Sequence, residues 1–138
     1  MTFNFSCLNI TSDCEITKKA AALFKDELIL RGFDSLDADG FDFNLIMLNE
    51  SSQEDFKIEI KENSISVSAH RLRGFIYGYS LFLRKSIFEK GKITLTQNIS
   101  GEYSPDKKIR GHQLGYRDTN NTCDAWGEEE YRRYLLDL

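Results

Sequence analysis

The strongest constraint on the fold comes from residues 109–138, whose pattern predicts a strand, a polar loop and a helix. The strand-like run IRGHQLGYR starts at Ile109, and the polar loop follows it. The helix begins with an acidic turn, Glu128 to Glu130, and then carries apolar residues at helical spacing: Tyr131, Tyr134, Leu135 and Leu138. A single β/α unit cannot bury its own faces, because a parallel sheet or barrel needs several. We therefore expect residues 107–138 to be the first β/α unit of a truncated (β/α)8 barrel.

Composition limits the classes of partner. The chain has 138 residues and a formal net charge of −4, so it lacks the basic surface that nucleic acid or anionic lipid requires. No apolar run reaches the roughly 18 residues of a membrane span. We expect no nucleic-acid partner and no membrane partner. Residues 1–10 lack the basic start and unbroken apolar stretch of a signal peptide, so they do not indicate a compartment.

Neither a metal site nor a cofactor site is indicated by the cysteines or by short motifs. Cys7, Cys14 and Cys123 show no paired C-x-x-C spacing, so we expect three ordinary thiols without a disulfide framework or a zinc site. Motifs for a serine nucleophile, a phosphate loop and a zinc protease are absent from the sequence. We therefore expect no cofactor and no metal.

The acidic loop that ends at Asp42 offers a calcium alternative. Carboxylates at alternate positions ahead of Gly40 are how calcium loops gather their oxygens. With Gly40 as the sixth loop position, however, the first position is Ser35 and the twelfth is Ile46, so the usual acidic ligands are missing. A solvated turn is favoured over a calcium site.

The first part of the chain predicts a strand and a helix. Alternating apolar residues from Phe3 to Ile10 predict the strand. Ser12 and Glu15 have the spacing of a capping box, which predicts the start of the helix, and Gly32 predicts its end. The apolar stripe of this helix consists of Ile16, Ala20, Leu23, Phe24 and Leu28.

Three strands are predicted next. The nearly continuous apolar run of residues 43–48 is typical of a central strand that is buried on both faces. Residues 56–60 and 65–69 alternate between apolar and polar side chains on either side of the turn Glu62-Asn63. They predict an antiparallel hairpin with one face in solvent.

A second helix is predicted over residues 71–88, and it carries two glycines four positions apart, Gly74 and Gly78. Each glycine costs the helix about 1 kcal/mol, so we expect close packing on the sheet to compensate. Residues 93–95 predict a short strand, and residues 98–106, with Pro105, a linker. We expect an α+β domain over residues 1–106, with two helices on one face of a mixed, mostly antiparallel sheet in the order β-α-β-β-β-α-β.

Three features have a functional and a structural interpretation. Residues 73–77 partly match the aromatic RNA-binding strand, but the helical spacing continues past them, so helix packing is favoured. His70 stands alone at a strand-to-helix corner, where a satisfied polar group is more common than a ligand. Trp126 could stack on a sugar, although its place at a helix start favours a packing anchor.

Two stretches together resemble the small α+β domain that precedes the catalytic barrel in three glycoside hydrolase families. These are the β-hexosaminidases of family 20, the α-glucuronidases of family 67 and the O-GlcNAcase-like enzymes of family 84. In these enzymes a hairpin leads into a helix with a G-x-x-Y-G-type motif, which Gly74, Tyr77 and Gly78 match. A linker with proline then leads to an R-G start of the first barrel strand, as Pro105 and Arg110-Gly111 do here.

The resemblance implies substrate-binding residues at the end of that barrel strand, where the active face of a barrel lies. Gly115 and Tyr116 match a glycine and an aromatic residue of the family 84 enzymes. Arg117 is similar to a sugar-binding arginine of family 20 and could hold a hydroxyl or carboxylate through its planar fork. The alternative for Arg117 is an ion pair with a nearby aspartate such as Asp118. His112 lies in the same predicted strand and is the remaining candidate.

The resemblance implies a non-catalytic accessory domain of a glycoside hydrolase that acts on poly- or oligosaccharides and packs against its own barrel. We expect this chain alone to be inactive, because the catalytic carboxyl groups of these families lie on later barrel strands. Carbohydrate would bind only through the barrel, and an exposed C-terminal helix would allow self-association. A parent enzyme of this kind suggests export or the periplasm. The alternative is a free-standing α+β module that binds a protein or peptide at a sheet edge.

Overall fold

The structure is a computed structural model that describes residues 2–107 and 126–137. The chain divides into two compact units, Met1–Pro105 and Asp106–Leu138. The described part of the second unit contains helix α3 (Glu128–Asp137). In chain order, the elements of the first unit are β1 (Phe3–Phe5), β2 (Leu8–Thr11), α1 (Glu15–Leu30), β3 (Phe41–Met47), β4 (Phe56–Lys61), β5 (Ser64–Ala69), α2 (Leu72–Lys85), β6 (Ser86–Glu89), β7 (Lys92–Leu95) and β8 (Gly101–Tyr103).

The strands of the first unit form a smaller sheet in the order β1-β7-β6 and a larger sheet in the order β2-β3-β5-β4-β8. In the larger sheet β3 runs parallel to both β2 and β5, whereas β4 is antiparallel to β5 and to β8. The pairings of the smaller sheet are antiparallel. The predicted α+β class, the mixed sheet and the central position of β3 are confirmed. The smaller sheet is an addition that the sequence pattern does not predict.

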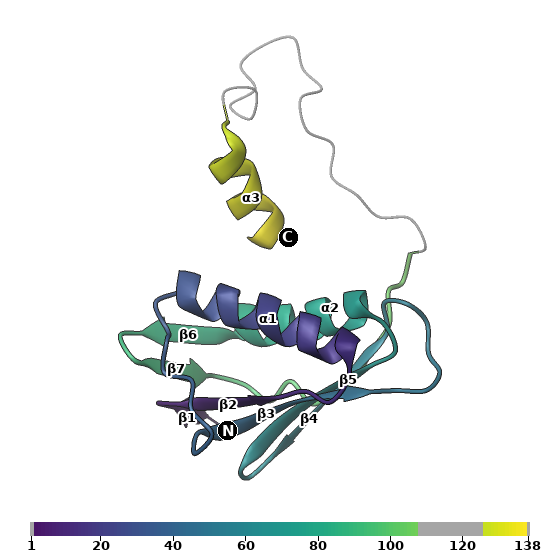
Figure 1. Ribbon diagram of the computed structural model, residues 1–138, viewed down its shortest axis with the longest axis horizontal. Helices are drawn as coiled ribbons and strands as arrows, with labels where there is room; N and C mark the ends of the chain where they lie inside the picture. Colours follow the sequence, from purple (N-terminus) through teal and green to yellow (C-terminus); the bar gives the residue numbers. More distant parts are fainter. Residues whose placement is uncertain (1, 108–125, 138) are drawn as a thin grey trace. The chain divides into compact units, whose positions relative to one another are not determined.

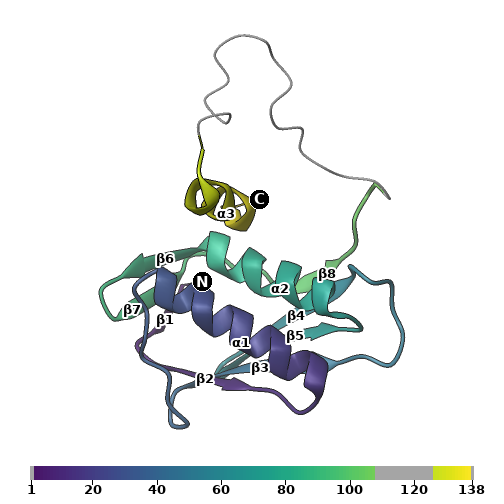
Figure 2. The ribbon, with the colours of Figure 1, turned by 45° about the horizontal axis from the view of Figure 1, so that its top comes forward.

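Helices α1 and α2 lie side by side on one face of the larger sheet, as predicted (Figure 1 and Figure 2). Aromatic rings fill the space between them and the strands. The ring of Phe24 lies 4.5 Å from that of Phe43 and 5.1 Å from that of Tyr79, between centroids. Phe82 of α2 lies 5.1 Å from Phe43. Such tilted, stacked and edge-on pairs add about 1 kcal/mol each to the gain from burial, so this aromatic cluster is the main core of the unit.

The other face of the larger sheet is polar, which corrects the prediction that the central strand is buried on both faces. Phe43 and Leu45 are buried beneath the helices, but Ile46 points to the opposite face and is 43% exposed. On that face Asn9 donates a hydrogen bond to Asp42 across β2 and β3 at 2.9 Å. With helices on one side only, the three β3 side chains of the opposite face, Asp42, Asn44 and Ile46, are not covered by a helix.

Two predicted elements have different boundaries. The single strand expected from Phe3 to Ile10 is divided into β1, which pairs with β7, and β2, which pairs with β3. The second helix ends at Lys85, and the residues after it form β6 rather than a last turn. In both places apolar residues satisfy either arrangement, so the pattern alone does not locate the break. Gly91, with φ of +72°, lies in the turn between β6 and β7.

The start of α1 also differs from the prediction, and its end agrees with it. The cap is Cys14 rather than Ser12, and the Cys14 N–H donates to the Thr17 hydroxyl at 2.9 Å. Thr17 is the third residue after this cap, so it takes the role that the capping-box prediction gave to Glu15, and it is fully buried. Gly32 has φ of +79° and closes the helix in the left-handed conformation, as expected.

Close contact between α2 and the sheet explains the two helical glycines. A Cβ atom at Gly74 would lie 2.5 Å from the carbonyl oxygen of Asp55. A Cβ atom at Gly78 would lie 2.4 Å from Val67 Cγ1 and 3.3 Å from the Phe56 ring. Both positions are buried against β4 and β5, so the expected compensation by close packing is confirmed.

We predict that Gly78→Ala lowers the free energy of unfolding by about 1 to 2 kcal/mol. Overpacking costs about 1–3 kcal/mol, and alanine returns about 1 kcal/mol of helix propensity. Urea unfolding followed by circular dichroism measures the change. Ser80→Ala, at a half-buried position of the same helix, is the control for propensity. Val67→Ala removes the clashing methyl group, so its cost should be smaller in the Gly78→Ala background than in the parent chain. Equal costs in both backgrounds would contradict the packing argument.

Candidate functional site

The four substrate-binding residues predicted from the resemblance, His112, Gly115, Tyr116 and Arg117, lie outside the described residues, as does Cys123. They remain predictions.

His70 has a structural role at the corner between β5 and α2. Its Nδ1 lies 2.9 Å from the backbone oxygen of Leu48, and the Leu48 N–H donates to the Ala69 oxygen at 2.8 Å. These contacts join the ends of the neighbouring parallel strands β3 and β5. The favoured interpretation of His70 as a satisfied polar group agrees with this geometry.

The segment that resembled an RNA-binding strand lies in α2. Phe75, which would have to offer its ring to a base, is fully buried in the core. Base stacking needs exposed rings on a strand. The RNA-binding alternative is therefore excluded for this segment.

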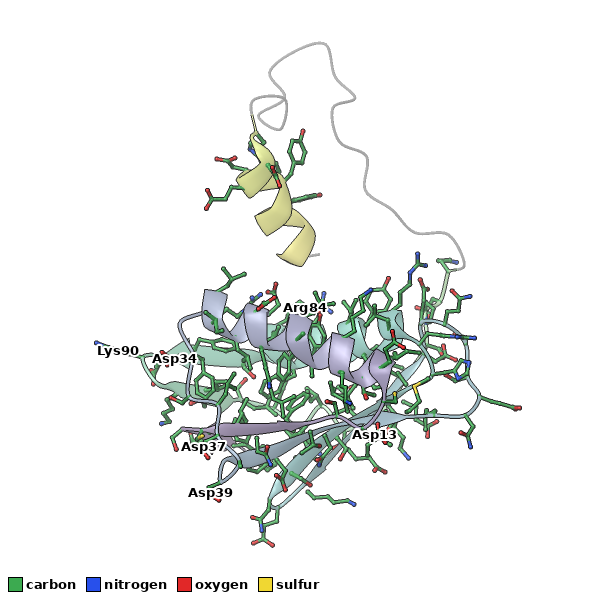
Figure 3. All side chains as sticks on the ribbon, viewed as in Figure 1. Asp13, Asp34, Asp37, Asp39, Arg84 and Lys90 are labelled. Carbon is green, nitrogen blue, oxygen red and sulfur yellow. The ribbon has the colours of Figure 1, made fainter. Side chains whose placement is uncertain are left out.

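The acidic loop after α1 covers the edge of β2. Phe33 is fully buried, and Leu36 forms a parallel bridge with Leu8. Asp34, Asp37 and Asp39 lie at separate points along the loop (Figure 3). Within residues 2–107 and 126–137, no group of three or more histidine, cysteine or acidic side chains is placed to hold a metal ion. The loop is thus partly packed structure rather than a fully solvated turn.

The outward side of the helices carries an apolar surface. It consists of residues that are exposed by 38% to 62%, and we call it the helix outer surface: Leu23, Ile29 and Leu30 of α1 and Tyr77 of α2. Leu23 and Leu30 are two turns apart and so share one side of α1. Leu23 was expected in the core stripe, but its position is at the margin of the buried face. Ile87 of β6 is also exposed.

Helix α2 is positively charged, although the chain as a whole is negatively charged. The helix contains Arg73, Arg84 and Lys85 and no acidic residue, whereas the net charge of the chain is −4. Arg84 and Lys85 lie in the last turn, where cations stabilise the negative end of the helix dipole. A partner of this helix would meet apolar side chains bordered by positive charge. None of the helices in the described ranges has the length and apolar character to cross a bilayer.

The open face of the larger sheet is different, because its polar groups bind one another. Lys57 lies 3.1 Å from Glu59 and 3.8 Å from Glu102. The hydroxyl of Thr11 donates to Asn44 across β2 and β3 at 2.6 Å. This face is suited to solvent, so the helix outer surface is the better candidate for a protein contact.

Two ionisable side chains of the helix layer are buried, Glu27 of α1 and Tyr79 of α2. Glu27 is 7% exposed and forms an ion pair with Arg31 one turn later. Tyr79 is 4% exposed and stacks on Phe24. Burial raises the pKa of Tyr79 to about 12, and the negative charge of Glu27 adds to this rise. The Tyr79 hydroxyl therefore keeps its proton at neutral pH.

Helix α3 fixes its own start. The Gly127 N–H donates to the Glu130 carboxylate at 2.9 Å, which is one half of a capping box. Trp126, just before the cap, packs on Tyr131 at 5.6 Å and on Tyr134 at 5.4 Å between ring centroids. Contact between the residue before the cap and the fourth helical residue is a hydrophobic staple. Trp126 therefore acts as a packing anchor of this helix, as the favoured interpretation holds.

Comparison with known proteins identifies the fold. No protein-family model matches the sequence, and no curated protein matches it. Among solved structures, the exo-β-N-acetylglucosaminidase of glycoside hydrolase family 20 from Vibrio harveyi, in complex with N-acetylglucosamine, gives a TM-score of 0.56 at 17% identity, covering 69% of this chain and 16% of that chain. An inactive mutant of that enzyme gives 0.54 at 18% identity, over 68% and 15% of the two chains.

A third solved structure is an enzyme of glycoside hydrolase family 138 that targets pectin rhamnogalacturonan II. It gives a TM-score of 0.43 at 22% identity, over 53% of this chain and 12% of that chain. The chain spans about 16% of the length of the first family 20 structure. At this identity the likeness to the family 20 enzyme shows the fold: an α+β domain that also occurs within a glycoside hydrolase.

We predict that alkaline pH destabilises the first unit through Tyr79. An unfolded tyrosine has a pKa of about 10, whereas folding raises the pKa of Tyr79 to about 12. The folded chain therefore holds this proton more tightly, and its contribution to stability is complete below pH 10 and lost as pH rises from about 10 to about 12. Urea midpoints measured across this pH range should fall less steeply for Tyr79→Phe than for the parent.

Tyr77→Phe is the matched control, because Tyr77 lies on the same helix and is 38% exposed. It should leave the pH dependence close to that of the parent. A Tyr79→Phe variant with the parental slope would contradict the assignment.

Proposed function

We propose that residues 1–106 form a non-catalytic accessory domain of a glycoside hydrolase, which packs against and supports a catalytic barrel. We further propose that the parent acts on poly- or oligosaccharides and is hexosaminidase-like or α-glucuronidase-like. The observation that carries the proposal is the fold likeness to the family 20 enzyme, in which the matching region is 16% of a much longer chain. The motif resemblance around Gly74, Tyr77 and Gly78 supports it independently.

The helix outer surface is the part of this domain that would meet the barrel. Full burial of a leucine or isoleucine side chain contributes about 1.5–3 kcal/mol, and the helices expose Leu23, Ile29 and Leu30 by 38% to 62%. The opposite face, where polar groups are already paired, would gain little from a contact. In this arrangement the domain would stabilise the barrel by burying apolar surface between them.

In the proposed enzyme the chemistry belongs to the barrel. Glycosidases need two carboxyl groups, or one with an acetamido group of the substrate, across the bond to be cleaved. We propose that later barrel strands supply them and that carbohydrate binds through the barrel alone. Gly115, Tyr116, Arg117 and His112 would then lie in the first barrel strand, near its active face. Export or the periplasm would suit an enzyme that acts on polysaccharide.

The first test is the natural gene beyond the codon for Leu138. The proposal expects an open frame that encodes repeated strand and helix units with carboxylates at strand ends. A stop codon directly after Leu138 would overturn it and favour the free-standing module that binds a protein or peptide. In that case the next step would be to compare how much protein or peptide partner the chain pulls down with its sheet edges intact and with them blocked.

We predict that Leu30→Asp destabilises the full-length protein more than it destabilises residues 1–138 alone. Leu30 is 62% exposed in the first unit, so a carboxylate there should cost little until a barrel covers it. Thermal unfolding of both lengths, together with turnover of an aryl β-N-acetylglucosaminide and an aryl α-glucuronide, measures the effect.

Ile46→Asp provides the matched control on the opposite face, where Ile46 is 43% exposed. Its effect should be equal in the long and the short protein. If Leu30→Asp also has equal effects in both, the helix outer surface does not contact the barrel. A full-length protein that cleaves neither substrate would count against the proposed enzyme classes, but not against the contact.

A further inference from the structure

The chain leaves the first unit along a strand that is fastened to the larger sheet. Residues 98–106 were expected to be a linker, but residues 101–103 form β8, which pairs with β4 next to it (Figure 2). The ring of Tyr103 stacks on Phe56, its partner in register, with 4.8 Å between centroids and 12° between planes. The Tyr103 hydroxyl donates to the backbone oxygen of Ile99 at 2.9 Å, and Ile99 is buried.

Asp55 continues this attachment beyond the end of the strand. Its carboxylate accepts a hydrogen bond from the Ser104 hydroxyl at 2.8 Å and another from the Ser52 N–H at 3.2 Å. Hydrogen bonds from Ser52 and Ser104 lower the pKa of Asp55, so the carboxylate stays charged and accepting at neutral pH.

Asp55 also contacts the start of α2 through its backbone. Its carbonyl oxygen would lie only 2.5 Å from a Cβ atom at Gly74, so no side chain fits there. Next to it, Arg73 and Glu54 form an ion pair at 3.4 Å. One residue therefore touches both the helix that packs on the sheet and the segment by which the chain leaves it.

We propose that Asp55, Phe56, Tyr103 and Ser104 form an exit clamp, which fixes the point where the chain leaves the first unit and couples it to α2. A domain that ended in a solvated linker would impose no direction on the following residues. With the exit clamp closed, residues up to Ser104 keep the position of the sheet. The use of the clamp to orient a catalytic barrel rests on the proposed function, whereas the clamp itself does not.

The test is a double-mutant cycle on residues 1–138, with amide hydrogen exchange read by NMR. Ser104→Ala should speed exchange at Tyr103, whose N–H faces β4, by about fivefold, the effect of losing one ordinary hydrogen bond. Asp55→Ala also removes the acceptor of the Ser52 N–H, so it should speed this exchange at least as much. Exchange in the double variant should be only slightly faster than in the faster single variant, because both substitutions remove the hydrogen bond between Ser104 and Asp55. Exchange at the core residue Leu45 should remain at the parental rate.

Controls separate the clamp from general loosening. Asp34→Ala removes an exposed aspartate from another loop and should leave exchange at Tyr103 unchanged. Tyr103→Phe keeps the stacking on Phe56 but removes the bond to Ile99, and it should also speed exchange in β8. Unchanged exchange in Ser104→Ala, or fully additive effects in the double variant, would overturn the exit clamp. Neither result depends on enzyme activity, so a failure here is distinct from a failure of the proposed function.

Discussion

The approach of α2 to the larger sheet is the contact on which the rest of the first unit depends. Because Gly74 and Gly78 lack side chains, α2 lies closer to β4 and β5 than other residues would allow. A Cβ atom at either position would collide with Asp55 or Val67. That position brings the buried Tyr79 and Phe82 rings of α2 against α1 and β3. The packing of the aromatic core therefore depends on this close approach of α2 to the sheet.

A one-sided layer of helices gives the unit two unlike surfaces. The side chains between helices and sheet are buried, and the far face of the sheet satisfies its polar groups in pairs such as Asn9 with Asp42. The helices expose Leu23, Ile29 and Leu30 of α1 and Tyr77 of α2, whereas the far face of the sheet exposes Ile46. A sandwich of helices on both faces would have hidden the sheet instead. Under the proposed function, the barrel would form a second layer of protein over the helices.

The sequence predicts which helices and strands form better than it predicts where each begins and ends. The hairpin β4–β5, the helix end at Gly32 and the tight packing of Gly78 follow from local rules of alternation, capping and size, and the structure confirms them. The smaller sheet escapes prediction because its strands are three or four residues long and β1 pairs with a strand that is distant in sequence, as with Phe3 and Leu95. A short alternating run carries no signal of where it changes sheets.

The same difference between local and distant information applies to function. Surface candidates such as Leu30 need the three-dimensional arrangement, because helical spacing alone does not separate the margin of a buried face from its centre. The exit clamp is a stronger case: Asp55 and Ser104 are 49 residues apart, and by composition the second lies in a linker. The pairing of β8 with β4 brings them together. A segment that composition assigns to a flexible connection is therefore part of the fold, and the boundary of the domain is set by strand pairing rather than by the proline that follows.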